Sequence, residues 1–175
     1  RARCATFYRH EAVTAVRQMK LELTLLLWTV SHYHGMLPAL VQLKNVGYVG
    51  AEGPIFGGSP ASLKPWAKRL DDLGFERTAV TIRTDGDNPI SSDAKIRAVG
   101  VEATKRTLDC CHELGATSIC GPYHSAIGLF SGTGPTQDEW KWGVDSMRLV
   151  AEHARADGLR LGVGSRTQVG QSSTN

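Results

Sequence analysis

Apolar runs and amphipathic stretches alternate along the chain from Met19 onward. Short, nearly continuous apolar runs are typical of strands buried on both faces of a parallel sheet, and they predict strands at residues 21–28, 48–55, 78–83, 117–121 and 159–163. Between them, apolar residues recur every three or four positions, which predicts helices at about 37–46, 60–73, 92–114 and 137–157.

Local signals mark the ends of the predicted helices. Ser59 is placed as an N-cap before Pro60. Thr136 and Glu139 have the spacing of a capping box, in which each side chain satisfies a backbone N–H at the helix start. Glycines follow the four helices as C-terminal stops, at Gly47, Gly74, Gly115 and Gly158.

The spacing also predicts which helix positions are buried. The expected inward positions are Leu63, Trp66, Ala67, Leu70 and Leu73; then Ile96, Val99, Ala103, Thr107, Cys110 and Leu114; then Trp140, Val144, Met147, Ala151 and Ala154.

Strands that alternate with helices predict an α/β fold with a parallel sheet and right-handed crossovers. One unit takes about 35 residues, so eight units would need roughly 280 residues, as in a larger (β/α)8 TIM barrel. The chain holds four to five such units. It is therefore expected to be either the N-terminal part of a truncated barrel or a complete five-stranded, flavodoxin-like open sheet with a small ligand at its strand ends.

We expect three segments: a leader or upstream segment at 1–18, a domain at 19–164 and an unstructured tail at 165–175. The Arg-rich leader has the composition of a transit peptide, but its lack of an apolar stripe favours Met19 as the natural start. The tail lacks any hydrophobic periodicity.

Composition and charge narrow the class of protein. Hydrophobic residues make up 41% and charged residues 21% of the chain, which is typical of a globular domain, and no apolar stretch is long enough for a membrane span. The net charge of +3 arises entirely within the first eighteen residues, so a nucleic-acid partner is not expected. Four cysteines, two of them adjacent, do not suggest a disulfide framework, and we expect a cytoplasmic protein.

Four motifs occur in order along the predicted units. They are Gly50-Ala51-Glu52-Gly53-Pro54-Ile55-Phe56, Ser92-Asp93 before a long helix, Lys105-Arg106-Thr107-Leu108-Asp109-Cys110-Cys111-His112-Glu113-Leu114-Gly115-Ala116, and Cys120-Gly121-Pro122-Tyr123-His124-Ser125 followed by Glu139-Trp140-Lys141. With these motifs, residues 19–163 resemble the N-terminal half of the sugar isomerase/epimerase family of xylose isomerase-like TIM barrels, in particular its D-tagatose (D-psicose) 3-epimerase branch.

The resemblance implies metal-assisted epimerisation of a ketose, in which Mn²⁺, Co²⁺ or Mg²⁺ chelates the sugar oxygens and two glutamates move the proton through an enediolate. In the family the metal ligands come from the ends of strands five to eight. At the first of these positions, where the family pattern has Leu-Gly-Val-Glu, this chain has Leu161-Gly162-Val163-Gly164. We therefore expect this chain alone to lack an intact catalytic acid, to bind no metal and to be inactive, as a truncation or a shifted reading frame would leave it.

Six residues are predicted by the resemblance to bind substrate on the active face: Trp28, Glu52, Thr81, Gly121, Tyr123 and His124. For Glu52 the position alone also favours function, because a carboxylate at the carboxyl end of a strand lies on the catalytic face of a barrel. Ile127 stands where some epimerases place a Trp against the sugar, so a D-tagatose-type substrate is not assured.

Other candidate chemistry has simpler interpretations. His32 and His34 form a His-x-His after the first strand and are interpreted as pocket-rim residues. Cys110 and Cys111 are interpreted as core thiols, because adjacent helix residues point about 100° apart. Trp66 and Trp140 are predicted to lie in the core. The Gly-rich loop at 128–134 lacks the Lys-Ser/Thr of a phosphate-binding P-loop.

Two function classes remain open. The first is a sugar isomerase/epimerase acting on a small sugar. The second is a non-catalytic half-barrel remnant that binds a sugar-like ligand or self-associates, because an open half-barrel exposes strand edges and an apolar face.

Overall fold

The computed structural model describes residues 20–32 and 34–164. Five strands form one fully parallel sheet in the order β1-β2-β3-β4-β5. The strands are β1 (Glu22–Thr24), β2 (Gly50–Pro54), β3 (Glu76–Val80), β4 (Ser118–Gly121) and β5 (Arg160–Val163). The helices are α1 (Leu37–Asn45), α2 (Pro60–Asp72), α3 (Ala94–Leu114) and α4 (Gln137–Asp157), with short 3-10 turns at Leu25–Leu27, His34–Met36 and Asp85–Asp87.

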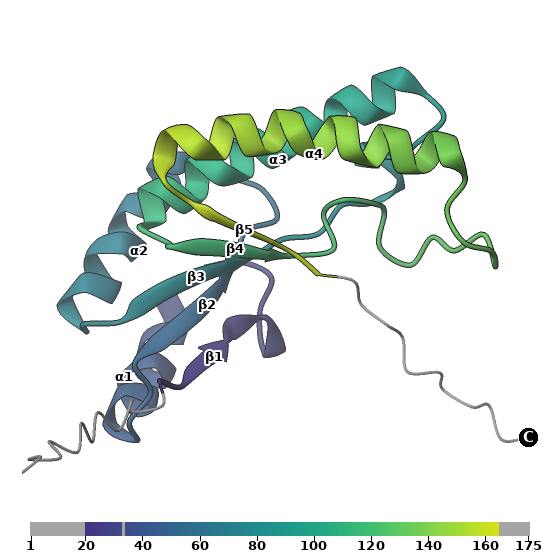
Figure 1. Ribbon diagram of the computed structural model, residues 1–175. Helices are drawn as coiled ribbons and strands as arrows, with labels where there is room; N and C mark the ends of the chain where they lie inside the picture. Colours follow the sequence, from purple (N-terminus) through teal and green to yellow (C-terminus); the bar gives the residue numbers. More distant parts are fainter. Residues whose placement is uncertain (1–19, 33, 165–175) are drawn as a thin grey trace, which may run out of the picture.

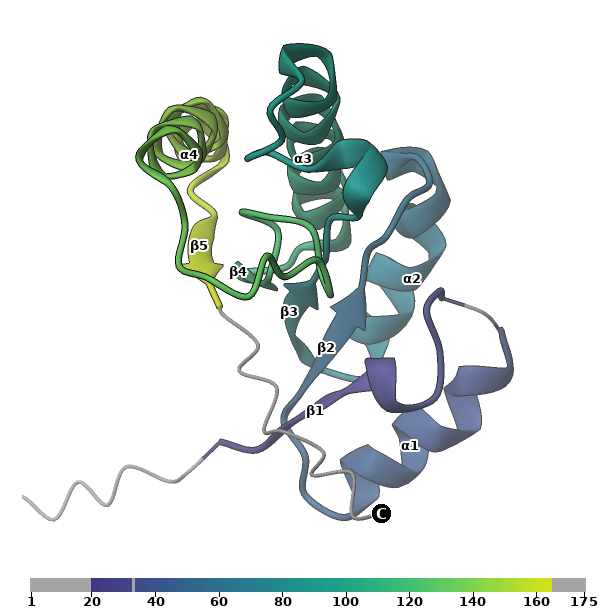
Figure 2. The same ribbon diagram turned by 90° about the vertical axis from the view of Figure 1, so that its right-hand side faces the viewer.

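The four helices lie on one face of a curved sheet, and the concave face carries no helix of the described chain (Figures 1 and 2). Successive strands are neighbours, with no reversal of strand order. A doubly wound open sheet reverses its order and has helices on both faces. The flavodoxin-like alternative is therefore wrong, and the expected run of (β/α) barrel units is confirmed.

The core lies between the sheet and the helices. Ala51, Ala79 and Ile119 point outward from three neighbouring strands and are at most 2% exposed. Trp66 of α2 and the adjacent thiols Cys110 and Cys111 of α3 are buried against this layer, as predicted.

The predicted helix ends agree with the structure. Thr136 Oγ1 accepts a hydrogen bond from the Glu139 amide at 3.1 Å, and the Glu139 carboxylate accepts one from the Thr136 amide at 2.7 Å. Gly115 and Gly158 end α3 and α4 in the left-handed conformation. Ser59 occupies the N-cap position of α2, although its side chain makes no capping hydrogen bond.

Two of the predicted strands are displaced or shortened. Residues 25–27, predicted as strand, form a 3-10 turn, at whose start the Leu26 amide donates to Thr24 Oγ1 at 3.4 Å. The third strand is Glu76–Val80 rather than 78–83, although the next residue still continues the backbone pairing, with the Thr81 amide donating to the Cys120 carbonyl. An apolar run cannot distinguish a strand from a buried turn that follows it.

Three predicted inward positions are exposed: Val99, Trp140 and Ala151. In α4 the buried residues are Ser146, Val150 and Ala154, spaced by four. Helix α4 contacts α3 and β5 along this narrow stripe. The predicted apolar stripe is broader than the contact, and this leaves Trp140 and Ala151 exposed beside it.

The expectations for residues 1–18 and 165–175 lie outside the described residues. Within the described ranges, no helix has the length and apolarity that a membrane span requires.

Candidate functional site

A cavity of about 290 Å³ opens on the concave face at the carboxyl ends of the strands. Glu52 lines it together with Gly121 and Gly164. The pairing register places Thr24 of β1 beside Glu52 of β2, so both side chains reach the same face of the sheet. The structure thus brings Glu52 and Gly121, two of the predicted substrate-binding residues, to one cavity with Gly164, the position of the expected acid.

Gly121 allows the sheet to close tightly at the floor of this cavity. Its φ of +131° is one that residues with a side chain rarely adopt, and a Cβ here would lie 2.1 Å from the carbonyl oxygen of Thr81. The Gly164 amide in turn donates to the Gly121 carbonyl at 3.3 Å. The glycine therefore shapes the cavity through its backbone.

Gly164 faces the cavity with space beside it. A Cβ at this position would be in ordinary contact with Cys120 Sγ, at 3.6 Å. The backbone would thus accept a side chain where the family pattern has a glutamate, but this chain supplies no oxygen there. Ile127 lines the same cavity and makes that part of its wall apolar.

The inner face of the sheet below the cavity is polar. Thr78 Oγ1 donates to the carboxylate of Glu22 at 3.1 Å, and the Glu22 side chain lies across Gly50, where a Cβ would approach it to 2.7 Å. The hydrogen bond between Thr78 and Glu22 therefore links β3 and β1 on the inner face of the sheet.

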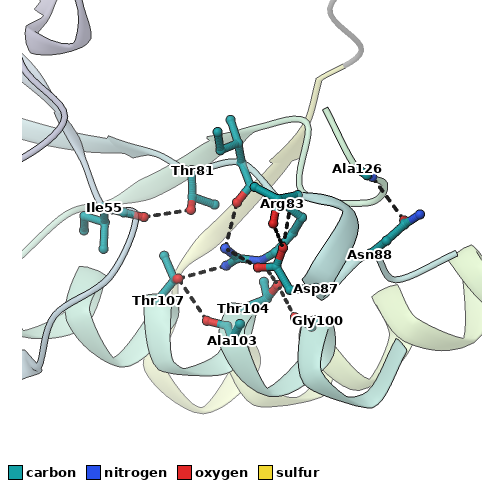
Figure 3. A network of polar contacts seen from close by, with 12 residues as sticks. Ile55, Thr81, Arg83, Asp87, Asn88, Gly100, Ala103, Thr104, Thr107 and Ala126 are labelled. Carbon is teal, nitrogen blue, oxygen red and sulfur yellow. Dashed lines mark hydrogen bonds and ion pairs between the residues drawn. The ribbon is translucent and has the colours of Figure 1, made fainter. Parts of the chain in front are cut away.

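Trp28 and Thr81 do not line this cavity. Trp28 is 62% exposed and directly follows the 3-10 turn after β1. Thr81 is fully buried on the helical side, where its hydroxyl donates to the Ile55 carbonyl at 2.7 Å (Figure 3). Its contribution to the site is to hold the chain segment that follows β2.

Tyr123 and His124 also point away from the cavity. Tyr123 is fully buried, and burial raises the pKa of its hydroxyl to about 12. His124 lines a different, mainly apolar cavity of about 420 Å³ beside Trp140 and Val163, and burial lowers its pKa. The Tyr123 hydroxyl and His124 Nδ1 find no hydrogen-bond partner within the described residues.

His32 has a packing role. Its ring stacks at an angle on Trp66 with 5.4 Å between centroids, and its Nε2 lies over Gly53, where a Cβ would be 2.7 Å away. Burial lowers its pKa. It lines a third cavity, beside Trp66 and the loop that follows β2, and not the cavity that holds Glu52.

Consecutive parallel (β/α) units with a cavity at the carboxyl edge define the class of (β/α)-barrel proteins, whose active sites lie on that edge. A family model described as "Xylose isomerase-like TIM barrel" matches residues 40–164. The chain belongs to this family.

Individual relatives of this chain are described as sugar 3-epimerases. An L-ribulose 3-epimerase of Mesorhizobium japonicum is 30% identical over 136 residues, which are 77% of this chain and 45% of that protein. Two solved structures are similar in fold. One, described as L-ribulose 3-epimerase, has a TM-score of 0.74 at 24% identity and covers 83% of this chain and 49% of its own. The other, a D-allulose 3-epimerase from Methylomonas sp. in complex with D-allulose, has a TM-score of 0.72 at 20% identity and covers 81% and 49%. The chain spans about half the length of these relatives.

The described residues that line this cavity do not fit a divalent metal. In the part of the chain that the structure describes, no three His, Cys, Asp or Glu side chains are grouped to hold an ion. Glu52 is the one acid among the described residues that line the cavity, and Gly164 has no donor side chain. One carboxylate is too small a donor set for Mn²⁺ or Mg²⁺, which bind several oxygen ligands.

Sequence reasoning did not identify Thr24, Val80 and Ile82 as lining residues. Strand alternation was the available signal, because inward residues on neighbouring parallel strands share a register. Counting in steps of two from Val80 selects Ile82 for the cavity and places Thr81 on the opposite face.

Proposed function

We propose that this chain forms the N-terminal half of the sugar site of a ketose epimerase, and that by itself it binds a small sugar without epimerising it. The observation that carries the proposal is the cavity at the carboxyl edge, lined by Glu52, in a member of an isomerase/epimerase family. L-ribulose and D-allulose, named with the relatives, are the substrate class we propose for the whole protein.

The role proposed for Glu52 is to orient the sugar. An ionised carboxylate accepts hydrogen bonds from two adjacent hydroxyls, which is a common way of holding a sugar. Thr24 beside it offers a further hydroxyl, and Ile127 gives the apolar wall. Trp28 offers the exposed aromatic surface on which the apolar face of a sugar ring stacks.

This chain alone is proposed to be inactive, because it has a glycine at position 164, where the family pattern has the catalytic glutamate. In the family the divalent ion supplies Lewis-acid polarisation of the sugar oxygens. We propose that metal-dependent epimerisation belongs to the complete barrel and that residues 19–164 are its N-terminal domain portion. The buried thiols and the lack of a disulfide among Cys110, Cys111 and Cys120 support a reducing compartment such as the cytoplasm.

The test measures sugar binding and turnover by the purified chain. We expect saturable binding of L-ribulose or D-psicose by ligand-observed NMR, weakened about tenfold in Glu52→Gln, because the substitution removes a charged hydrogen-bond acceptor. Glu152→Gln on the exposed face of α4 is the matched control and should bind like the parent chain. Equal binding by both variants contradicts the proposed role of Glu52.

The same preparation with Mn²⁺ should leave D-fructose unconverted to D-psicose. Conversion above the level without enzyme, together with stoichiometric Mn²⁺ binding by electron paramagnetic resonance, would show that this chain forms a complete catalytic site and would overturn the proposal.

Self-association is the second candidate function. Strands β1 and β5 are the two ends of the sheet order, and Leu27, Trp28 and Val163 near them are more than half exposed. Unpaired strand edges beside apolar surface favour pairing with a second copy. Sedimentation velocity between 5 and 200 µM (about a fortyfold range chosen to span weak association) should reveal a concentration-dependent dimer, and a monomer throughout excludes this function.

A further inference from the structure

A separate cavity of about 310 Å³ lies on the helical side of the sheet, away from the sugar cavity. It is enclosed by the loop after β2, the turn after β3 and the middle of α3. Arg83, Arg106 and Asp87 contribute its charged groups, and Gly57, Gly58 and Thr107 form part of its wall. Val80 and Ile82 face the sugar cavity whereas Arg83 points the other way, so the sheet separates the two cavities.

Arg83 is a buried cation held in a fixed position. It is 3% exposed, and its Nε and Nη2 donate to Thr104 Oγ1 and Thr107 Oγ1, each at 2.9 Å. Its Nη1 donates to the Ile82 carbonyl at 2.7 Å. Figure 3 shows the guanidinium between these α3 hydroxyls and Asp87. Both threonines are themselves fixed, because they donate to the α3 carbonyls of Gly100 and Ala103.

The positive charge of Arg83 is only partly balanced. The Asp87 carboxylate lies 3.7 Å from Nη1, longer than a hydrogen bond, and it also accepts from the Thr84 amide and hydroxyl at 2.6 and 2.7 Å. Within the described residues, its three hydrogen bonds use three of the five guanidinium N–H groups. The group therefore retains capacity for an anionic acceptor.

A second cation lies beside the first. Arg106 is exposed on α3 and lines the same cavity. Burial lowers the pKa of Arg83, the charge of Asp87 opposes this shift, and the charge of Arg106 adds to it. Glu102, one turn before it, is salt-bridged to Lys105 at 2.8 Å. Two arginines face one carboxylate here, so the described lining has a net charge of +1.

The loop after β2 forms an exposed part of the cavity wall, at two consecutive glycines. Gly57 and Gly58 are exposed, and a Cβ on Gly57 would meet no atom within 4 Å. Gly58 has a φ of +97°, so the loop bends sharply at its lip. Glycines allow an anion to approach the backbone closely, and two arginines provide the planar N–H groups that suit phosphate oxygens.

We propose that this cavity binds a phosphate-type oxyanion, either inorganic phosphate or the phosphate group of a small metabolite, between Arg83, Arg106 and the loop at Gly57–Gly58. The cavity is large enough for a phosphate with a short attached group. Because Arg83 fixes α3 to the turn after β3, the bound anion stabilises this junction and does not contact the sugar cavity.

The test is a titration of the chain with inorganic phosphate in one arm and glycerol 3-phosphate in the other, followed by ¹H–¹⁵N NMR at constant ionic strength. We expect saturable shifts of the Arg83 Nε–H, Gly57 and Gly58 signals. Tighter binding of glycerol 3-phosphate assigns the site to a phosphorylated metabolite, and equal or weaker binding assigns it to phosphate itself. Shifts that do not saturate, or that chloride reproduces at equal concentration, overturn the proposal.

Variants at the mouth test the residues without disturbing the buried network. Arg106→Gln is expected to weaken phosphate binding about tenfold. Lys105→Gln is the control, because it removes the same charge one residue away from a side chain that lines a different cavity. This control should change binding less than about twofold. Gly57→Asp places a carboxylate at the lip and should abolish binding, with Gly57→Asn as the neutral control. Unchanged binding in both Arg106→Gln and Gly57→Asp excludes this site.

Discussion

A single backbone angle at Gly121 determines how closely β3 and β4 approach at the floor of the sugar cavity. Only hydrogen fits between its Cα and the Thr81 carbonyl. The hydroxyl of the same Thr81 donates a hydrogen bond to the Ile55 carbonyl, directly after β2. At the scale of the residue, the site is thus shaped by a glycine and a buried threonine as much as by the carboxylate of Glu52.

Replacing Gly121 is expected to destabilise the fold. Gly121→Ala combines a strained φ with a backbone clash and should lower the free energy of unfolding by about 3 kcal/mol or more. Urea unfolding followed by circular dichroism measures the change. Gly134→Ala, where the added Cβ meets nothing within 4 Å, should stay within about 0.5 kcal/mol of the parent. Equal stability of the two variants would contradict the clash.

Helix α4 depends on its N-terminal cap. It begins after a long loop, and the Thr136–Glu139 pair satisfies two backbone N–H groups there. The Thr136 amide, which donates to the Glu139 carboxylate, and the Thr136 side chain lower the pKa of this carboxyl. The cap therefore fixes where α4 starts relative to the loop after β4.

Thr136→Ala is expected to cost about 1 kcal/mol of stability, the usual cost of losing such a cap. Thermal and urea unfolding measure this loss, and Ser92→Ala, an exposed position before α3, serves as the control. The interpretation fails if Thr136→Ser, which keeps the hydroxyl, is as destabilised as Thr136→Ala.

Two loops are joined by Asn88, which is 5% exposed. Its Oδ1 accepts from the Ile90 amide at 3.2 Å and, across the sheet edge, from the Ala126 amide at 3.1 Å (Figure 3). Asn88→Ala leaves the buried Ala126 amide without this acceptor, with an expected cost of about 2 kcal/mol. Hydrogen exchange at Ala126 should accelerate, while the exposed Asn45→Ala control leaves it unchanged. Unaltered exchange would show that the loop is held by other contacts.

At the scale of the whole molecule, two partly buried histidines make stability depend on pH. Burial lowers the pKa of His32 and of His124, so the folded chain binds fewer protons at these residues than the unfolded chain does. The unfolded state then binds more protons below about pH 6.5, and stability falls as the pH falls through that value. Above it the two residues have no such effect.

Urea midpoints at pH 7.5, 6.5 and 5.5 measure this dependence in a range where carboxylates remain ionised. We expect the midpoint to decrease toward pH 5.5, and to decrease less in the His32→Gln/His124→Gln variant. A variant with the same slope as the parent would assign the pH dependence to other groups.

Prediction from sequence succeeded for features fixed by neighbours along the chain. The capping box, the glycine stops and the α/β alternation depend on local chemistry and on the period of apolar residues. Val99 and Trp140 were misplaced because periodicity marks a broad stripe, whereas burial depends on which part of that stripe meets α3 or the sheet. Glu52 was predicted because a carboxylate at the carboxyl end of a strand lies on the catalytic face of a barrel, and it lines the cavity at that edge. Thr81, predicted for the same face, is instead buried on the helical side of its strand.

The sequence by itself determined the run of parallel (β/α) units, the helix ends and the absence of an acid at Gly164. Only the tertiary structure decided which side chains meet. The consecutive residues Ile82 and Arg83 line two different cavities. The hydrogen-bond acceptors of Arg83 on α3 lie more than twenty positions away in the sequence. The physical reason is that side-chain direction depends on strand register, and register is set by long-range pairing and packing, which a local pattern does not specify.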